Sequence, residues 1–208
     1  MMSNMTSNIL SILIWLPILG GILILSTGGD RSAQLARKIA LGFSAGTFLL
    51  SLSLYADFDM TTASMQFVER HMWIENLHVQ YSLGVDGISM PLIILTTLLT
   101  VIVVIAGWEV ITKRVAQYMA SFLIMEGLMI GVFSSMDAIL FYLFWEAMLI
   151  PMFLIIGVWG GSNRVYAAVK FFLYTLIGSL LMLVALSLIH ISEPTRRTPI
   201  SYAVFCLK

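Results

Sequence analysis

Residues 138–160 read AILFYLFWEAMLIPMFLIIGVWG, a run with a single charged side chain, Glu146. A helix needs about 20 apolar residues to cross the hydrocarbon core of a bilayer, so this run predicts a membrane-spanning helix. A charge at bilayer depth costs roughly 2.5–3.5 kcal/mol even on lenient insertion scales, and such residues usually serve an ion or proton path. The stretch therefore decides the fold class and supplies the first candidate functional residue.

The composition of the whole chain agrees with that stretch. The 208 residues are 60% hydrophobic and 11% charged, with a mean hydropathy of +0.98. A soluble domain carries about a quarter charged residues, so these values exclude one and indicate an integral membrane protein. The formal net charge is zero and Lys and Arg form no basic stripe, so we expect no nucleic acid as a partner.

Six apolar runs are long enough to span a membrane. They cover residues 9–25, 39–55, 88–110, 119–134, 138–159 and 167–185. We therefore predict an all-α polytopic membrane protein with six transmembrane helices, in one transmembrane domain over residues 1–185. The first run lacks a basic leader and a small-residue cleavage site, so we expect it to be a retained helix rather than a signal peptide.

Positive charges alternate between the loops and predict the topology. The loops after the first, third and fifth spans carry Lys and Arg, whereas the intervening loops carry only Arg70. Loops rich in Lys and Arg are cytoplasmic, so the N-terminus should face outward. The basic residues concerned are Arg31, Arg37, Lys38, Lys113, Arg114, Arg164 and Lys170.

The long outer loop, residues 56–87, offers two weaker patterns. Met72 to Leu83 alternates loosely around Glu75-Asn76, which is compatible with a β-hairpin. His71 and His78 lack a third ligand at a suitable spacing, so we interpret them as solvated side chains and expect no metal site. Cys206 is the only cysteine, so disulfides, thiolate metal sites and cysteine nucleophiles have no support.

Glu146 combines depth with an unusual helix. It follows Asp137 by nine residues, which at 1.5 Å per residue is roughly 13 Å, near the bilayer centre. Pro151 cannot donate a hydrogen bond to the Ala147 carbonyl, so backbone acceptors are left beside the acid. These features suit proton relay; a glutamate that only bonds a neighbouring helix for packing is the alternative interpretation.

Glu126, in the preceding span, is the second candidate. Counted from the turn at residues 134–137, it should be roughly level with Glu146, and the two acids may then face each other as a pair that cannot both ionise. A structural role for Glu126 is an equally open alternative. We interpret Glu109 and Lys170 as anchors at the membrane boundary, and Asp137 as the N-cap of its helix.

Three motifs occur in order along the chain. They are GVDGIS at 84–89, FWEAMLIPM at 144–152 and KFFLYT at 170–175. In this order and with this number of helices, they resemble the M chain family of respiratory complex I, the proton-pumping NADH:quinone oxidoreductase, over essentially all of residues 9–185. The sequence of the second motif resembles the M chain more than the sister L and N chains.

This resemblance implies an architecture and a mechanism. The family fold is an antiporter-like bundle of roughly fourteen helices, of which this chain would supply the N-terminal part. Its mid-membrane glutamate on the fifth helix, which matches Glu146, transfers protons and pairs with a lysine on the seventh helix, absent here. Glu126 is not among the positions that the resemblance carries over.

The resemblance also implies partners and a location. NADH, flavin, iron–sulfur clusters and quinone would belong to other parts of the complex, and this chain has no Gly-rich dinucleotide fingerprint and no cysteine ligands. The expected partners are the lipid bilayer and the other membrane-arm subunits, especially the L and N chains. We expect a bacterial plasma membrane, with the mitochondrial inner membrane as the less favoured location.

Residues 186–208 read LSLIHISEPTRRTPISYAVFCLK and differ in character from what precedes them. Residues 186–196 resemble the translation of a transposon-end adapter used in DNA library preparation. Residues 200–208 resemble a second adapter piece in the same frame. We therefore expect a non-native tail after about Ala185; a natural amphiphilic C-terminal tail is the alternative.

Two other functions compete with the proton-pumping subunit. A subunit of a multi-subunit cation/proton antiporter would have similar helices. A structural fragment that only fills a lateral interface would not need Glu146 and Pro151 at the membrane centre.

Overall fold

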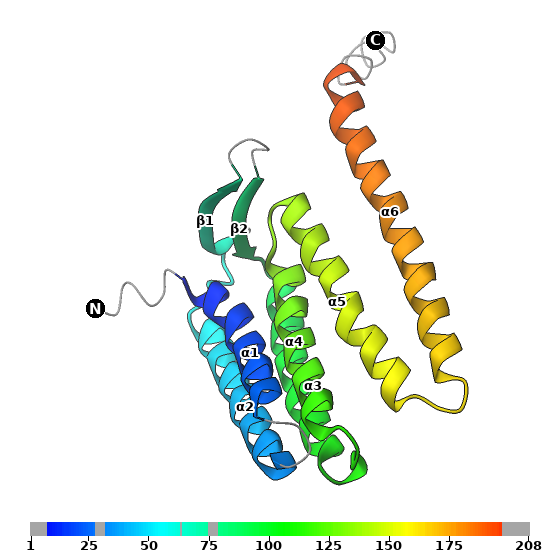
Figure 1. Ribbon diagram of the computed structural model, residues 1–208. Helices are drawn as coiled ribbons and strands as arrows, with labels where there is room; N and C mark the ends of the chain where they lie inside the picture. The colour runs from blue at the N-terminus through cyan, green and yellow to red at the C-terminus, as the bar shows by residue number, and fades with distance from the viewer. Residues whose placement is uncertain (1–7, 28–31, 63, 75–78, 197–208) are drawn as a thin grey trace, which may run out of the picture.

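The computed structural model describes residues 8–27, 32–62, 64–74 and 79–196. Six helices and one two-stranded antiparallel sheet make up the described part of the chain, and Figure 1 shows the helices side by side with the hairpin at one end. In chain order the elements are α1 (Ile9–Ser26), α2 (Ala33–Ala56), β1 (Gln66–Ile74), β2 (Val79–Val85), α3 (Ser89–Val110), α4 (Val115–Ser134), α5 (Ala138–Trp159) and α6 (Arg164–Arg196).

Helices α1 to α4 form a bundle in which glycines permit close approach of the backbones. A Cβ built on Gly127 of α4 would lie 2.5 Å from the carbonyl oxygen of Ile14 in α1. On the other side of the same contact, a Cβ on Gly21 would lie 3.0 Å from the Ala120 carbonyl oxygen. Small residues at such contacts are typical of helices that associate inside a bilayer, where lipid offers no hydrophobic driving force.

Helices α5 and α6 extend the bundle on one side (Figure 1). Asp137 caps α5, because its Oδ1 accepts hydrogen bonds from the backbone nitrogens of Ile139 at 2.9 Å and Leu140 at 3.1 Å. This confirms the predicted N-cap. Helix α6 packs on α5, and the rings of Phe153 and Phe172 meet edge to face at 5.6 Å between centroids. In the best apolar window of α6 only 11% of residues are buried, against 61% in α4.

The hairpin packs against the nearby ends of α1, α4 and α5. Its strands pair from Gln66↔Val85 to Ile74↔Val79, with two register shifts. The backbone N–H of Met136, in the α4–α5 turn, donates to the Ser82 carbonyl oxygen at 2.9 Å. Strand β2 therefore holds the turn from which α5 starts.

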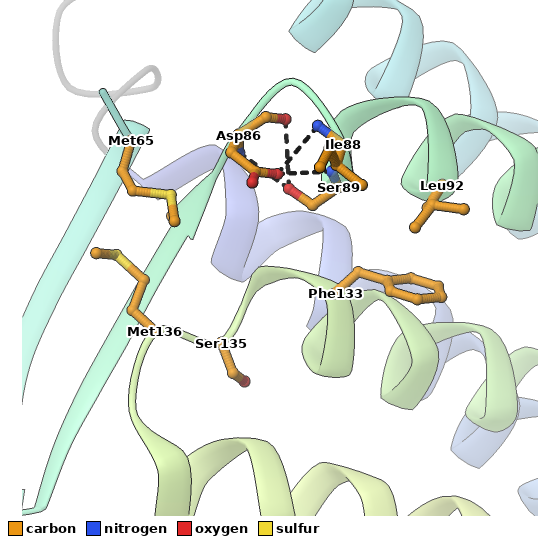
Figure 2. Close-up of a pocket in the computed structure, with 9 residues that line it drawn as sticks. Met65, Asp86, Ile88, Ser89, Leu92, Phe133, Ser135 and Met136 are labelled. Atoms are coloured by element: carbon orange, nitrogen blue, oxygen red, sulfur yellow. Dashed lines mark hydrogen bonds between the residues drawn. The ribbon is translucent and has the colours of Figure 1, made fainter. Parts of the chain in front are cut away.

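A small cavity of about 260 Å³ lies where the hairpin meets α3 and α4. Figure 2 shows Met65 and Met136 on one side of it and the start of α3 on the other. Asp86 Oδ1 accepts the backbone N–H groups of Ile88 at 3.1 Å and Ser89 at 2.7 Å. These bonds, that of Ser89 first, lower the pKa of the Asp86 carboxyl from its ordinary value. Asp86 is thus a capping residue for α3.

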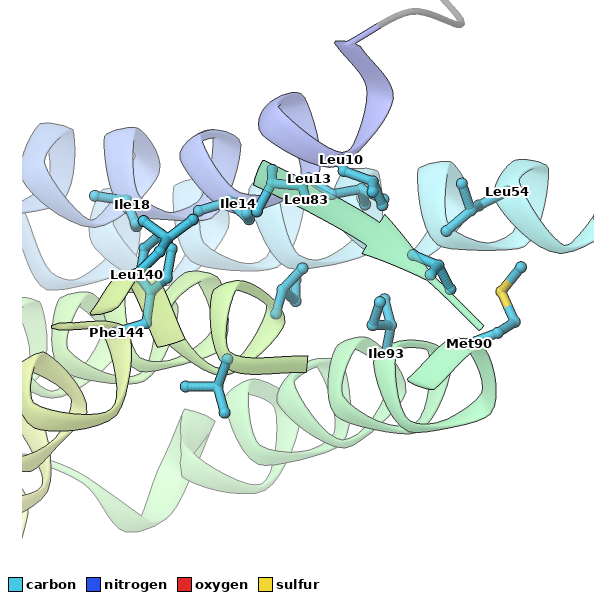
Figure 3. Close-up of a cluster of buried hydrophobic side chains, with 13 residues drawn as sticks. Leu10, Leu13, Ile14, Ile18, Leu54, Leu83, Met90, Ile93, Leu140 and Phe144 are labelled. Carbon is cyan, nitrogen blue, oxygen red and sulfur yellow. The ribbon is translucent and has the colours of Figure 1, made fainter. Parts of the chain in front are cut away.

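One apolar cluster joins the hairpin to the helices (Figure 3). Leu83 of β2 lies among side chains of α1, α3 and α5, such as Leu10, Ile93 and Leu140. A second cluster, built around Val104 and Met119, fills the opposite half of the α1–α4 bundle. The core therefore belongs to the first four helices and reaches α5 only at its start.

The predicted spans agree with these helices apart from some of their ends. Helix α5 has the predicted bounds, whereas α2 and α4 begin earlier, at Ala33 and Val115. Six described helices are long and apolar enough to span a membrane, the last over Arg164–Ala185. The all-α description must be extended by the hairpin, which the loop pattern had suggested. The expected tail begins within α6, and residues 197–208 lie outside the described part of the chain.

Candidate functional site

Glu146 lies near the middle of α5 and is half-buried. Its Oε1 atom is buried without a hydrogen-bond partner among the described residues. The Tyr142 hydroxyl, one turn earlier on the same helix, lies beside the Glu146 carboxylate. Helix α5 continues through Pro151 without a break. The acid is therefore exposed on one side and held by its own helix on the other.

Helix geometry puts Ser179 of α6 at about the depth of Glu146, on the side of α6 that packs on α5. The contact between Phe153 and Phe172 fixes how α5 and α6 face each other. Seven residues are about two helical turns and return to the same face of a helix. Toward the hairpin end, this step leads from Phe153 to Glu146 on α5 and from Phe172 to Ser179 on α6. Ser179 is buried, and its hydroxyl donates to the Thr175 carbonyl oxygen at 2.8 Å. Sequence analysis had not singled out this serine.

Glu126 lies inside the α1–α4 bundle and is 1% exposed. Both of its carboxylate oxygens are buried without a partner among the described residues. A Cβ on Gly107 of α3 would lie 3.7 Å from the Met119 side chain of α4. Gly107 and Met119 therefore lie on the sides of α3 and α4 that face each other. Two turns further toward the hairpin, the same faces carry Thr100 and Glu126. The acid therefore points toward α3.

A line of buried hydroxyl groups lies between α2 and α3, and helix geometry puts part of it at about the depth of Glu126. Ser51 and Thr97 hydrogen-bond across the two helices at 2.9 Å. Thr47 and Thr100 lie about one turn further toward Glu126, and both donate to carbonyl oxygens of their own helices. A hydroxyl that donates in this way still has lone pairs that can accept a hydrogen bond from another group. We call Thr47, Ser51, Thr96, Thr97 and Thr100 the hydroxyl seam.

The two membrane carboxylates do not form a facing pair. The ring of Phe144 contacts the Cβ position of Gly131, which marks the α4–α5 interface. At 100° per residue, Glu126 is turned about 140° from Gly131 and Glu146 about 160° from Phe144. The expectation that the two acids might face each other is therefore wrong. It failed because depth can be counted along one helix, whereas direction depends on how neighbouring helices pack.

The other polar residues named from the sequence lie outside these two centres. Glu109 and Lys170 are exposed, and the Lys170 ammonium lies 5.7 Å from the Tyr166 ring centroid. Within the described residues, no group of three His, Cys, Asp or Glu side chains is placed to hold a metal ion. His78 falls outside those residues.

Glu69 is a buried acid whose role no sequence pattern indicates. It lies on β1, is 3% exposed, and accepts the backbone N–H of Leu10 at 2.8 Å. It also accepts the backbone N–H and the hydroxyl of Ser11, which in turn hydrogen-bonds Tyr81 at 3.2 Å. A carboxylate at a helix N-terminus satisfies unpaired N–H groups and complements the helix dipole. Glu69 thus caps α1 from the hairpin.

Two family models match the chain along consecutive segments. The amino terminus of NADH-ubiquinone oxidoreductase chain 4 matches residues 39–136. The transmembrane family of NADH:quinone oxidoreductase and Mrp antiporters matches residues 135–199. Together they account for more than half of the chain, so its helices are those of an antiporter-like membrane subunit.

Curated relatives agree. The NADH-quinone oxidoreductase subunit M of Rhodobacter capsulatus is 50% identical over 191 residues, covering 90% of this chain and 37% of the relative. Subunit M of Rickettsia prowazekii is 42% identical, covering 88% and 38%. NADH-ubiquinone oxidoreductase chain 4 of Arabidopsis thaliana is 49% identical, covering 86% and 36%. The chain belongs to the family of M chains, also called chain 4, of NADH:quinone oxidoreductase, and it spans a little over a third of their length.

A solved structure shares the fold. The chain is similar to part of the membrane-bound sulfane sulfur reductase, an archaeal respiratory membrane complex, with a TM-score of 0.72 and 21% identity. The match covers 96% of this chain and 30% of the other. At this identity the likeness concerns the arrangement of helices.

Proposed function

We propose that this chain acts in a membrane-arm subunit of NADH:quinone oxidoreductase, where it takes part in proton translocation coupled to electron transfer from NADH to quinone. The observation that carries the proposal is Glu146, a carboxylate near the middle of a membrane-spanning helix, with one buried oxygen that has no partner among the described residues. Membership of the M chain family supports it.

Glu146 is the proton-transfer residue in this proposal. Its half-buried position leaves one side open to a group on another helix, and its depth makes an unpaired charge costly. A carboxyl in such a place takes up a proton when a cationic partner moves away and releases it when the partner returns. The Tyr142 hydroxyl, which lies beside the carboxylate, can give or accept a hydrogen bond as the carboxyl changes state.

Glu126 is a secondary proton site in this proposal. A buried carboxylate with no partner is costly when ionised, so the surrounding packing favours the neutral acid. Neither carboxylate oxygen hydrogen-bonds the hydroxyl seam in this structure, so proton exchange between them would need a movement or a bridging water. Since Glu126 faces α3 while Glu146 faces α6, protons would reach the two acids by different routes.

The remainder of the proposal follows from the family. Other membrane-arm subunits, especially the L and N chains, are the partners, and NADH, flavin, iron–sulfur clusters and quinone are bound elsewhere in the complex. The membrane is the bacterial plasma membrane, with the N-terminus outside. The full bundle has roughly fourteen helices, and a lysine on a later helix is the partner of Glu146.

The test uses a full-length relative in which the matching segment is replaced by residues 9–185 of this chain. Glu146→Gln keeps the shape of the side chain but cannot release a proton. We expect proton pumping, followed by a pH-sensitive dye in inverted membrane vesicles, to fall roughly tenfold or more. Assembly and NADH oxidation by an artificial acceptor that bypasses quinone should remain.

A matched control is Glu109→Gln, which removes an exposed carboxylate at the end of α3. It should pump normally. Glu126→Gln should give an intermediate loss if Glu126 is a secondary site. Unchanged pumping in Glu146→Gln, with assembly retained, contradicts the proposal and favours a structural role.

A cation/proton antiporter subunit is the second candidate, because the matched family also includes Mrp antiporters. It predicts that deletion of the native gene lowers tolerance to Na⁺ or K⁺ while NADH oxidation is unchanged. Loss of coupled NADH oxidation with normal salt tolerance would exclude it.

A further inference from the structure

Two neighbouring cavities lie at the end of the molecule opposite the hairpin. The first has a volume of about 560 Å³ and is lined by Thr112, Lys113, Arg114 and Arg164. The second, of about 390 Å³, is lined mainly by apolar side chains of α1, α4 and α5. We call them the basic cavity and the apolar cavity. None of the residues lining the basic cavity is acidic.

Arg114, Val158 and Trp159 line both cavities, so the two are neighbours that share a wall. The apolar cavity contains Leu25, Ile150 and Leu154 and reaches from this wall into the membrane-spanning region. One elongated molecule can therefore place an anionic end in the basic cavity and an apolar chain along α5.

The basic cavity is held in shape by contacts between loops. The Trp159 indole N–H donates to the Lys113 carbonyl oxygen at 3.0 Å and ties the end of α5 to the α3–α4 loop. Arg164 Nη1 donates to the Val158 carbonyl oxygen at 3.0 Å. Arg37 Nη2, from α2, donates to the Ile111 carbonyl oxygen at 2.9 Å. These bonds position the walls before any ligand arrives, which lowers the entropy cost of binding.

The cations on these walls keep hydrogen-bonding capacity. Arg164 uses one terminal nitrogen on Val158, and a guanidinium has five N–H donors. Within the described part of the chain, the Lys113 ammonium takes part in no hydrogen bond or ion pair, and only the Lys113 carbonyl oxygen is engaged. The nearest acid in sequence is Glu109, which is exposed on the last turn of α3. A phosphate group in the basic cavity would therefore lie near two cationic side chains, those of Lys113 and Arg164.

We propose that these two cavities form a binding site for an anionic phospholipid, with its phosphate in the basic cavity and one acyl chain in the apolar cavity. Basic pockets between transmembrane helices on the cytoplasmic side of a membrane bind anionic lipid headgroups. The site lies at the same end as Arg37 and Lys38, the end predicted to be cytoplasmic. Trp159 stands at the boundary, where indole rings favour the headgroup region.

The phosphate sets the specificity of this site. An acyl chain that leaves the bilayer for an apolar groove gains little hydrophobic energy, because lipid tails are as apolar as the groove. The chain instead distinguishes a lipid from a free phosphate compound, which would fill the basic cavity alone. The inference is independent of proton pumping.

The test uses the full chain in detergent and native mass spectrometry. Dioleoyl phosphatidylglycerol and dioleoyl phosphatidylcholine are added together, and we expect the anionic lipid to be retained preferentially. Lys113→Gln with Arg164→Gln should weaken that retention by about fivefold for each cation removed. The matched control, Lys38→Gln with Lys170→Gln, removes the same charge from exposed sites outside both cavities and should leave retention unchanged.

A second variant tests the apolar cavity. Leu154 is 45% exposed, so Leu154→Trp fills the cavity without disturbing the core. It should weaken binding of dioleoyl phosphatidylglycerol and leave binding of the short dihexanoyl form unchanged. Glycerol 3-phosphate, added as a competitor, should displace the long-chain lipid poorly.

Three results would overturn the proposal. The first is equal loss in the control pair, which would mean diffuse attraction to charge. The second is full displacement by glycerol 3-phosphate, which would mean a phosphate site without a lipid chain. The third is no retention in the full-length chimera described above, which would mean that the rest of the protein covers both cavities.

Discussion

The α1–α4 bundle and the α5–α6 pair each hold one membrane carboxylate, but they hold it differently. Glu126 is enclosed by the bundle, whereas Glu146 is half-buried on a helix whose neighbour α6 is mostly exposed. An enclosed acid can store a proton but exchanges it slowly with another group. An acid at an edge can meet a partner on a further helix. The difference suggests that depth selects candidates, while the packing around each acid decides its role.

The largest effect should come from breaking the bundle at its closest contact. In Gly127→Ala the new Cβ would lie 2.5 Å from a backbone oxygen of α1, which cannot move alone. We expect a loss of about 3 kcal/mol in the free energy of unfolding, measured by steric trapping in bicelles. Gly157→Ala is the matched change on α5, where the nearest atom would be 3.6 Å away. It should be neutral or slightly stabilising, because alanine favours helix. Equal losses would remove the distinction between bundle and edge.

The next effect concerns the two carboxylates that cap helices. Glu69→Ala leaves buried N–H groups of α1 without an acceptor, so we expect a loss of about 2 kcal/mol. Asp137→Ala removes two similar bonds at the half-buried start of α5 and should cost about 1 kcal/mol. Thermal unfolding in one detergent compares the two. A larger loss for Asp137→Ala would contradict the ranking.

Glu126→Leu should stabilise the bundle. It replaces a buried polar group that lacks partners by an apolar one of similar size, for a gain of about 1 kcal/mol. Glu146→Leu should gain less, because only one of its carboxylate oxygens is buried without a partner among the described residues, against both oxygens of Glu126. Thermal unfolding of Glu126→Leu, compared with proton pumping of Glu126→Gln, tests whether Glu126 lowers the stability of the bundle while it supports pumping. A destabilised Glu126→Leu would mean that the acid has a partner.

The smallest effect is a pH dependence at the hairpin end. The pKa of Asp86 is lowered in the folded chain, so its ionised form adds stability that is complete above the unfolded pKa of about 3.9. That contribution disappears as the pH falls through the lower folded pKa. Asp86→Asn should therefore be slightly less stable than the parent chain at pH 7, and the difference should shrink as the pH falls through the lowered pKa of Asp86. A difference that does not change with pH would contradict this assignment.

Sequence reasoning succeeded where one helix carries the whole signal. Asp137 and Gly160 bracket a continuous apolar run, and α5 has the predicted bounds. The depth of Glu146 needed only the rise per residue. The start of α2 was harder to predict, because Arg37 and Lys38 interrupt the apolar pattern although both belong to the helix. Long basic side chains reach the boundary from positions inside a helix.

The roles that the sequence did not reveal depend on contacts between distant segments. Glu69 caps a helix that lies 59 residues earlier in the chain, and nothing in its own surroundings predicts this. The same holds for Ser179, whose placement at about the depth of Glu146 depends on how α6 packs on α5. The direction of Glu126 required the packing of α4 on α1 and α3.

The Glu69 cap also has a consequence for biogenesis. Helix α1 leaves the ribosome first, but the carboxylate that satisfies its N-terminus is made 59 residues later. At 5–20 residues per second, this delay is roughly 3–12 s. During that interval α1 must be held in the translocon or the bilayer with unpaired N–H groups facing water. The hairpin then closes on the N-terminus of α1, so folding of the segment between α2 and α3 completes the cap of a helix made earlier.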